Sequence, residues 1–138
     1  MANTLYDIGR RVAASTGLDW ENTAYSCILV DTGQYTPNFS SHQYLDDISA
    51  SAYAASGTQA LSAKAIDTNG ALDANDVTFP NVSGGDNLEA VIIYQNTGNA
   101  ATSTLIAYLD TATGLPITPN GGDIIVTWDN GVNKILRL

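Results

Sequence analysis

Histidine and cysteine are the residues most able to carry metal or nucleophilic chemistry, and this chain has one of each, His42 and Cys27. A zinc site takes about four such ligands, so two are too few. A Ser-His-Asp relay needs an activated serine beside the histidine, but residues 40–43 show no nucleophile-elbow glycine pattern. Cys27 lies in an apolar run, where we expect a buried, inert thiol without an intrachain disulfide.

The acidic residues form two motifs that resemble known sites. The segment LVDTG (29–33) matches the core of the aspartic-protease signature. That chemistry needs two carboxylates sharing one proton, so a chain with one motif would have to act as a symmetric dimer. Gln34 stands where a small residue usually follows, and no later apolar-glycine strand is evident. We therefore interpret Asp31-Thr32-Gly33 as a turn that ends a strand.

The second acidic motif, DTNGALDAND (67–76), gathers oxygen ligands that could suggest calcium. An EF-hand loop needs glycine at its sixth position and glutamate at its twelfth, whereas Gly70 is fourth and Thr78 is twelfth. We expect an acidic, solvated loop. The segment Asn120-Gly121-Gly122 lacks the lysine of a phosphate-binding loop. No catalytic, cofactor or metal residue is predicted, and we expect the chain not to be an enzyme.

Short strands joined by turns dominate the predicted elements. Helical spacing of Leu5, Ile8 and Val12 predicts a helix over 4–14, with Asn3 or Thr4 as cap and Gly17 as its end. A second short helix is plausible over 41–48, capped by Ser40 or Ser41, and 50–64 is ambiguous. Strands are expected over 23–31, 61–66, 77–79, 88–95, 104–110, 123–128 and 132–138, with 88–95 central in its sheet and 67–76 a loop. Asp129-Asn130-Gly131 predicts a type I′ hairpin between the last two strands.

This pattern predicts an all-β fold, an antiparallel sandwich or jelly-roll-like domain with one or two short N-terminal helices. The 138 residues make one domain, 1–138, with a helical segment over 1–20 packed on it or extending from it.

Charge and hydropathy exclude several partners. The chain contains five Lys and Arg residues and fourteen Asp and Glu residues, which gives a formal net charge of −9. Nucleic-acid binders and proteins of anionic membrane surfaces need a basic face, so neither direct nucleic-acid binding nor membrane binding is expected. No apolar run approaches the roughly 18 residues of a membrane-spanning helix. The N-terminal residues lack the apolar core of a secretory signal, so we expect folding in a cytoplasm.

Two segments resemble one another: ILVDTGQYTPN (28–38) and AYLDTATGLPITPN (107–120). Each is an apolar strand followed by Asp-Thr, a glycine and Thr-Pro-Asn. The same turn residues recur by chance in many proteins, but the alternative is a pair of loops on one rim that form a contact surface. The candidate contact residues are Gln34, Tyr35, Thr36, Pro37, Asn38, Ile117, Thr118, Pro119 and Asn120. Tyr35 is the best single anchor because an aromatic side chain offers a large contact area, although a partly buried loop tyrosine fits the pattern equally well.

Three stretches together resemble small virion structural proteins of tailed bacteriophages, of the capsid decoration or cement type. They are MANTLYDIGRR (1–11), VDTGQYTPN (30–38) and the C-terminal run from GDNLEAVIIYQNTG (85–98) through TSTLIAYLDTATGLPITPNGGDIIVTWDNG (102–131) to KILRL (134–138). The resemblance implies a virion protein, assembled in the host cytoplasm, that binds the major capsid protein at capsomer junctions and stabilises the shell. It also implies a homo-oligomer, a trimer or dimer, with no cofactor.

Two other functions remain open at this point. The same resemblance fits a tail, neck or baseplate component. A glycan-binding β-sandwich module would instead need exposed aromatic platforms, for which Trp20 and Trp128 are the candidates. The position of Trp128 beside a predicted hairpin favours packing in a core or interface.

Overall fold

The computed structural model describes residues 3–53, 57–129, 131 and 134–137, which form three antiparallel sheets and one α-helix. This confirms the predicted all-β class with a short N-terminal helix. The strands are β1 (Thr4–Leu5), β2 (Tyr25–Val30), β3 (Gln59–Ala60), β4 (Ala65–Ile66), β5 (Ala71–Asp73), β6 (Val77–Phe79), β7 (Ala90–Gln95), β8 (Leu105–Leu109), β9 (Ile124–Val126) and β10 (Leu136–Arg137). The helical elements are α1 (Asp7–Ser15) and two 3₁₀ turns, η1 (Leu45–Asp47) and η2 (Ala50–Ala52).

The largest sheet has the strand order β1-β8-β7-β2-β3, so β7 is its central strand, as predicted for 88–95. All residues of β2 and β8 are buried, as are all but the last residue of β7. Strands that are covered on both faces consist largely of apolar residues, which is why these three strands could be predicted from the sequence. The β2–β7 pairing places Ile28 opposite Ile92.

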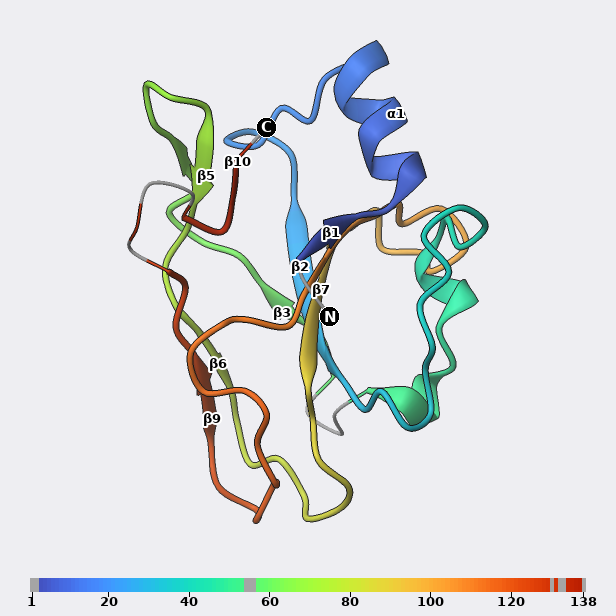
Figure 1. Ribbon diagram of the computed structural model, residues 1–138, viewed down its shortest axis with the longest axis vertical. Coiled ribbons are helices and arrows are strands. Elements are labelled where there is room, and N and C mark those ends of the chain that lie inside the picture. The colour runs from blue at the N-terminus through green and yellow to red at the C-terminus, as the bar shows by residue number, and fades with distance from the viewer. Residues whose placement is uncertain (1–2, 54–56, 130, 132–133, 138) are drawn as a thin grey trace.

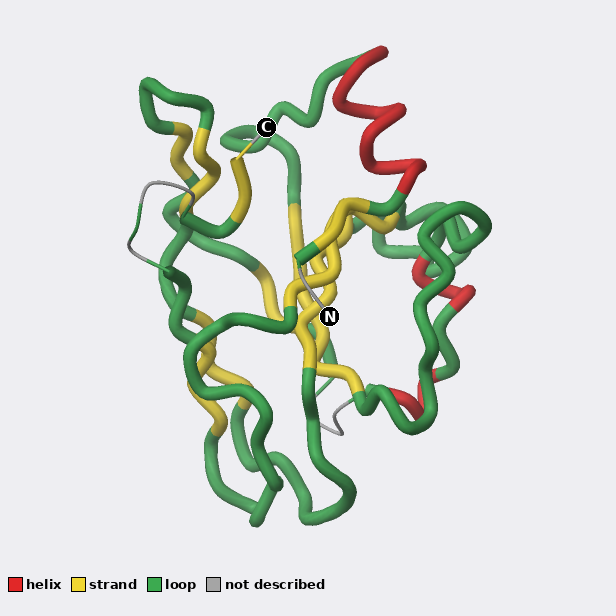
Figure 2. Tube along the Cα trace, viewed as in Figure 1, coloured by secondary structure: helices red, strands yellow, loops and turns green. Residues whose placement is uncertain are grey.

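Both faces of this sheet are covered, as Figures 1 and 2 show. One core lies toward the two smaller sheets and includes Trp20, Phe79 and Trp128. A second core lies on the opposite face, beneath the segment that carries η1 and η2, and includes Tyr6 and Tyr35. Successive strand residues point to opposite faces, so neighbouring residues of β2 enter different cores. The result is a layered, sandwich-like domain.

The two smaller sheets correct the predicted C-terminal hairpin. Strand β9 pairs with β6, whereas β10 pairs with β5 and places Leu136 opposite Leu72. The Ile135 amide donates to the Leu72 carbonyl, and the Ile135 side chain is buried in the first core. The pairing of β10 with β5 therefore replaces the predicted pairing between the last two strands. Residues 130 and 132 of the predicted turn lie outside the described residues.

The N-terminal segment packs on the domain instead of extending from it. Thr4 and Leu5 belong to β1, which pairs with β8, so α1 begins after Tyr6 and has no side-chain cap from Asn3 or Thr4. Pairing with β8 holds these residues in an extended conformation that a helix cannot include. At the other end the Gly17 amide donates to the Val12 carbonyl with a positive φ of 81°, which ends the helix as predicted.

The second predicted helix, 41–48, is wrong. Tyr44 forms a β-bridge with Thr104, and the Leu45 amide donates to the Ser103 carbonyl. Only the single 3₁₀ turn η1 follows, closed by the Asp47 carboxylate, which accepts from the Gln43 and Tyr44 amides. These two hydrogen bonds lower the pKa of Asp47. Contacts with the 96–104 segment thus replace the helical hydrogen bonds that the local sequence allows.

The acidic loop predicted over 67–76 also contains a strand, β5, because Leu72 is buried and faces the core. Strands β4 and β5 form a hairpin whose turn is Asp67 to Gly70. The Asp67 carboxylate accepts from the Asn69 and Ala71 amides, at 3.1 and 3.0 Å. This carboxylate therefore organises a turn.

Candidate partner-contact face

The Asp31 carboxylate closes the turn that follows β2. One of its oxygens accepts from the Gly33 amide at 2.7 Å and the other from the Gln34 side-chain amide at 3.2 Å. The Asp31 carbonyl accepts from the Gln34 and Tyr35 amides. These bonds agree with the interpretation of Asp31-Thr32-Gly33 as a strand-ending turn.

His42 and Tyr35 form a polar clasp under the same segment. The Nδ1 atom of His42 lies 2.9 Å from the Tyr35 hydroxyl and accepts from the Asn38 amide at 3.2 Å. The Tyr35 hydroxyl also lies 2.8 Å from that of Tyr6, which is fully buried. The histidine therefore holds the 35–42 segment against the second core.

This clasp corrects the proposed role of Tyr35. Only 4% of the residue is exposed, so its ring cannot serve as a surface anchor. Burial raises the pKa of Tyr35 to about 12, in keeping with a hydroxyl enclosed by the protein. Of the first candidate loop, Gln34, Thr36 and Asn38 are exposed and Pro37 is half-buried.

The cysteine and both tryptophans are core residues. Burial raises the pKa of the Cys27 thiol to about 12, which agrees with the expected inert thiol. Trp20 and Trp128 are 2% and 3% exposed, and their indole N–H groups donate to the carbonyls of Asp73 and Asn75. Neither ring can act as a glycan platform, so the sequence candidates for that function are wrong.

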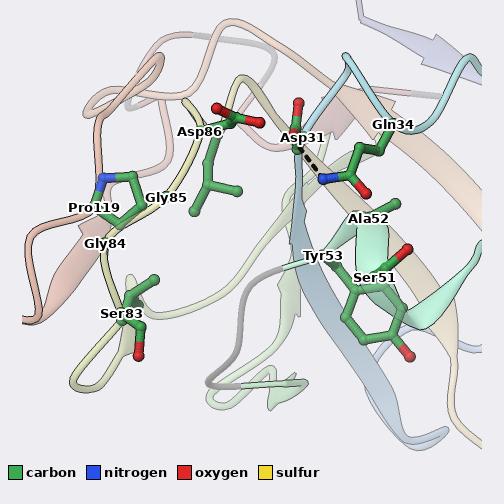
Figure 3. A pocket seen from close by; sticks show the side chains of 12 residues that line it. Asp31, Gln34, Ser51, Ala52, Tyr53, Ser83, Gly84, Gly85, Asp86 and Pro119 are labelled. Atoms are coloured by element: carbon green, nitrogen blue, oxygen red, sulfur yellow. Dashed lines mark hydrogen bonds between the residues drawn. The ribbon is translucent and has the colours of Figure 1, made fainter.

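The two similar loops meet at one end of the domain. Asp31 and Gln34 from the first loop and Pro119 from the second line one cleft of about 200 Å³ (Figure 3). Thr36 and Pro37 from the first loop and Asp110 from the second line a neighbouring hollow. The prediction of two loops on one rim thus agrees with this geometry.

The second loop also has a structural task. Thr113 bridges to Thr127, and Ile117 bridges to Leu88, so the loop joins β9 to the residues that precede β7. Pro119 is buried and Ile117 half-buried, whereas Thr118 and Asn120 are exposed. The side chain of Thr118 donates to that of Asn87. Only part of this loop is therefore available to a partner.

A third segment, residues 82–86, completes the cleft and was not predicted as part of a site. Val82 is buried and pairs with Gly121 and Gly122 through backbone hydrogen bonds. Ser83, Gly84, Gly85 and Asp86 are exposed and line the cleft. Their composition indicates a turn, but the partner segment around 121 lies about 40 residues away, so the sequence alone could not place them. We call the exposed parts of 31–38, 82–89 and 110–120 the loop face.

Charge on the loop face is of one sign. Asp31, Asp86, Glu89 and Asp110 lie in its three segments, and none of these segments contains a Lys or Arg. The cations of the chain are Arg10, Arg11, Lys64, Lys134 and Arg137. Of these, Arg10 and Arg11 lie in α1 and Arg137 in β10, toward the upper end of Figure 1, whereas the 82–86 and 117–122 segments lie toward the lower end. The three segments of the loop face therefore contribute acidic side chains and no basic ones.

No group of three or more His, Cys, Asp or Glu side chains within the described ranges is placed to share a metal ion. No helix in that part of the chain is both long and apolar enough to cross a lipid bilayer. A scan against protein-family models found no match, and a search of curated proteins found no significant match.

Proposed function

We propose that this protein is a non-enzymatic structural component of a bacteriophage virion, a decoration or cement protein that binds the major capsid protein at capsomer junctions. The observation that carries the proposal is the convergence of the two similar loops, 31–38 and 110–120, on one end of a rigid β-domain. The sequence resemblance set out above supplies the virion context. In this role the loop face meets the shell.

The physical properties of the domain suit such a role. Main-chain pairing and two apolar cores hold the loops in place, so little conformational entropy is lost when they bind. Many identical copies on one particle act together, so each contact can be small. A net charge of −9 keeps the outer surfaces of decorated particles apart through mutual repulsion.

A second candidate is a neck, tail or baseplate component, because a rigid domain with a contact face also suits those positions. Copy number separates the two. We would purify particles of the encoding phage and measure this protein against the major capsid protein by quantitative mass spectrometry. A ratio within a few-fold of one supports a shell protein, and a ratio near one to a hundred supports a neck or tail position. Absence from the particle would contradict both.

A further inference from the structure

The cleft in the loop face is lined by the buried carboxylate of Asp31. Asp31 is 7% exposed, and its hydrogen bonds come from an uncharged amide N–H and an uncharged side-chain amide. The ion pairs shown between described residues are Arg10–Asp7 and Lys134–Asp73, so neither involves Asp31. Buried carboxylates are usually paired with a positive group. A carboxylate oxygen can accept two hydrogen bonds, and one bond to each oxygen of Asp31 is shown, so this cleft-lining residue retains acceptor capacity.

The rest of the lining suits a side chain with an apolar stem and a cationic head. Ala52, Val82 and Leu88 supply buried apolar surface, and Ser51 and Ser83 supply hydroxyl groups. Asp86 adds a second, exposed carboxylate, which Figure 3 shows toward the same end of the cleft as Asp31. Long basic side chains lay their methylene groups on apolar surface and hold the charge at its edge. Among the residues that the structure describes, no Lys or Arg lines the cleft.

We propose that this cleft binds an arginine side chain presented by the protein to which the domain attaches. A planar guanidinium has five N–H donors, so it can bond two carboxylates at once, whereas a lysine ammonium acts as a compact point charge. The proposal rests on the proposed function, since it names the chemistry by which the loop face recognises its partner. The one-sided charge of the loop face would also steer a basic partner surface toward the cleft.

The test is a titration of the ¹⁵N-labelled full chain with the peptide acetyl-Gly-Arg-Gly-amide, followed by amide NMR shifts. The matched probe replaces arginine with citrulline, which has the same shape without the charge. We expect saturable shifts at Ser83, Gly84 and Gly85 with the arginine peptide. Because charge-assisted bonds are about twice as strong as neutral ones, we expect binding of the citrulline peptide to be weaker by about tenfold or more.

Three variants locate the binding site. Asp86→Asn removes the exposed carboxylate and should weaken arginine binding by about fivefold or more, since it removes a charge-assisted partner. Gly85→Leu keeps both charges and narrows the cleft; a Cβ there meets no atom within 4 Å and φ is not in the left-handed region, so the fold should tolerate it. Asp46→Asn, at an exposed carboxylate outside the cleft, should leave binding unchanged.

Several results would overturn the proposal. They are equal binding of the arginine and citrulline peptides, shifts confined to other segments, or unchanged binding by Asp86→Asn and Gly85→Leu. If the protein self-associates, and both added salt and Asp86→Asn abolish this association, the cleft binds a second copy of the chain instead. If the protein is present at the copy number of a shell protein but does not bind the arginine peptide, this inference alone is refuted. If the protein binds the peptide but is absent from particles, the proposed function is refuted.

Discussion

The Tyr35 hydroxyl lies between the polar groups of two other side chains. It is 2.8 Å from the Tyr6 hydroxyl and 2.9 Å from His42 Nδ1. A hydroxyl both donates and accepts, so it can serve both neighbours in one chain of hydrogen bonds. The aromatic residue that the sequence offered as a surface anchor instead fixes the loop from beneath.

Tyr35→Phe should therefore destabilise the domain. The substitution keeps the ring but leaves the buried Tyr6 hydroxyl without this partner, a loss of about 1–3 kcal/mol. Urea unfolding followed by circular dichroism measures the change. The matched control, Tyr53→Phe, alters a half-buried tyrosine and should change stability by less than about 0.5 kcal/mol. If the two substitutions lowered the free energy of unfolding equally, the structural role given to the Tyr35 hydroxyl would be contradicted.

Alkaline pH should weaken the fold through the buried acids. Burial raises the pKa of Cys27 and of Tyr35 to about 12, and it also raises that of Tyr6. The unfolded values are about 8.5 for cysteine and about 10 for tyrosine. A raised folded pKa means that the folded state holds protons which the unfolded state has released, so stability is full below the unfolded value and falls as pH rises toward the folded one.

We expect the free energy of unfolding to begin falling near pH 9 and to fall more steeply above pH 10. Urea titrations at half-unit steps from pH 7 to 11 measure it. Cys27→Ala lowers the starting stability but should move the onset toward pH 10, because only the tyrosines then contribute. A flat profile up to pH 11 would show that these groups are not buried as described.

At the scale of elements, α1 docks on β8 through a close backbone contact. A Cβ placed on Gly9 would lie 2.7 Å from the Ile106 carbonyl oxygen and 3.0 Å from its Cα. Both are backbone atoms and cannot rotate away. Gly9 thus sets how closely the helix approaches the sheet.

Gly9→Ala should destabilise the domain by about 1–3 kcal/mol through overpacking, although alanine favours helix formation. The matched control is Gly85→Ala, where a Cβ meets open space, so the same chemical change should be nearly neutral. Thermal unfolding of both variants gives the comparison. A Gly9→Ala protein as stable as the parent would mean that α1 sits farther from β8.

The elements that the sequence predicted well are those determined by local composition. Strands β2, β7 and β8 are continuous apolar runs, and the end of α1 is marked by Gly17. The errors arise where distant segments compete. Leu45 bonds to Ser103 instead of forming a helix, and β10 pairs with β5 instead of with its neighbour β9. Neither of these long-range contacts can be recognised from the local sequence pattern.

The same distinction applies to the candidate site. The shared composition of 31–38 and 110–120 left open whether the likeness is chance or the two loops lie on one rim, and the structure has both line the same cleft. The burial of Tyr35 and Pro119 and the participation of 82–86 depend on tertiary packing. The turn residues were thus recognisable, but their exposure was not.

For the whole molecule, the excess of negative charge dominates electrostatics. The chain has fourteen acidic residues and five Lys or Arg residues. Two ion pairs are shown between described residues, Arg10–Asp7 with an N–O distance of 2.7 Å and Lys134–Asp73 with one of 4.0 Å. Repulsion within the compact state opposes folding, and added salt screens it.

We therefore expect the thermal midpoint of the isolated protein to rise as sodium chloride increases from 10 to about 200 mM, over which the screening length falls below about 10 Å. Differential scanning fluorimetry of the intrinsic tryptophans measures it. Repeating the titration at pH 4.5, where acids begin to be protonated, should give a smaller rise. A midpoint that falls with salt at pH 7 would show that favourable ion pairs dominate instead.

Orientation on the particle is the central claim, because it joins the fold to the proposed function. A cryo-electron microscopy reconstruction of the intact phage particle tests it most directly. The account predicts this domain at capsomer junctions, with residues 31–38, 82–89 and 110–120 against the shell and α1 away from it. A domain that contacts the shell through α1, or that is found only at the neck or tail, would contradict it.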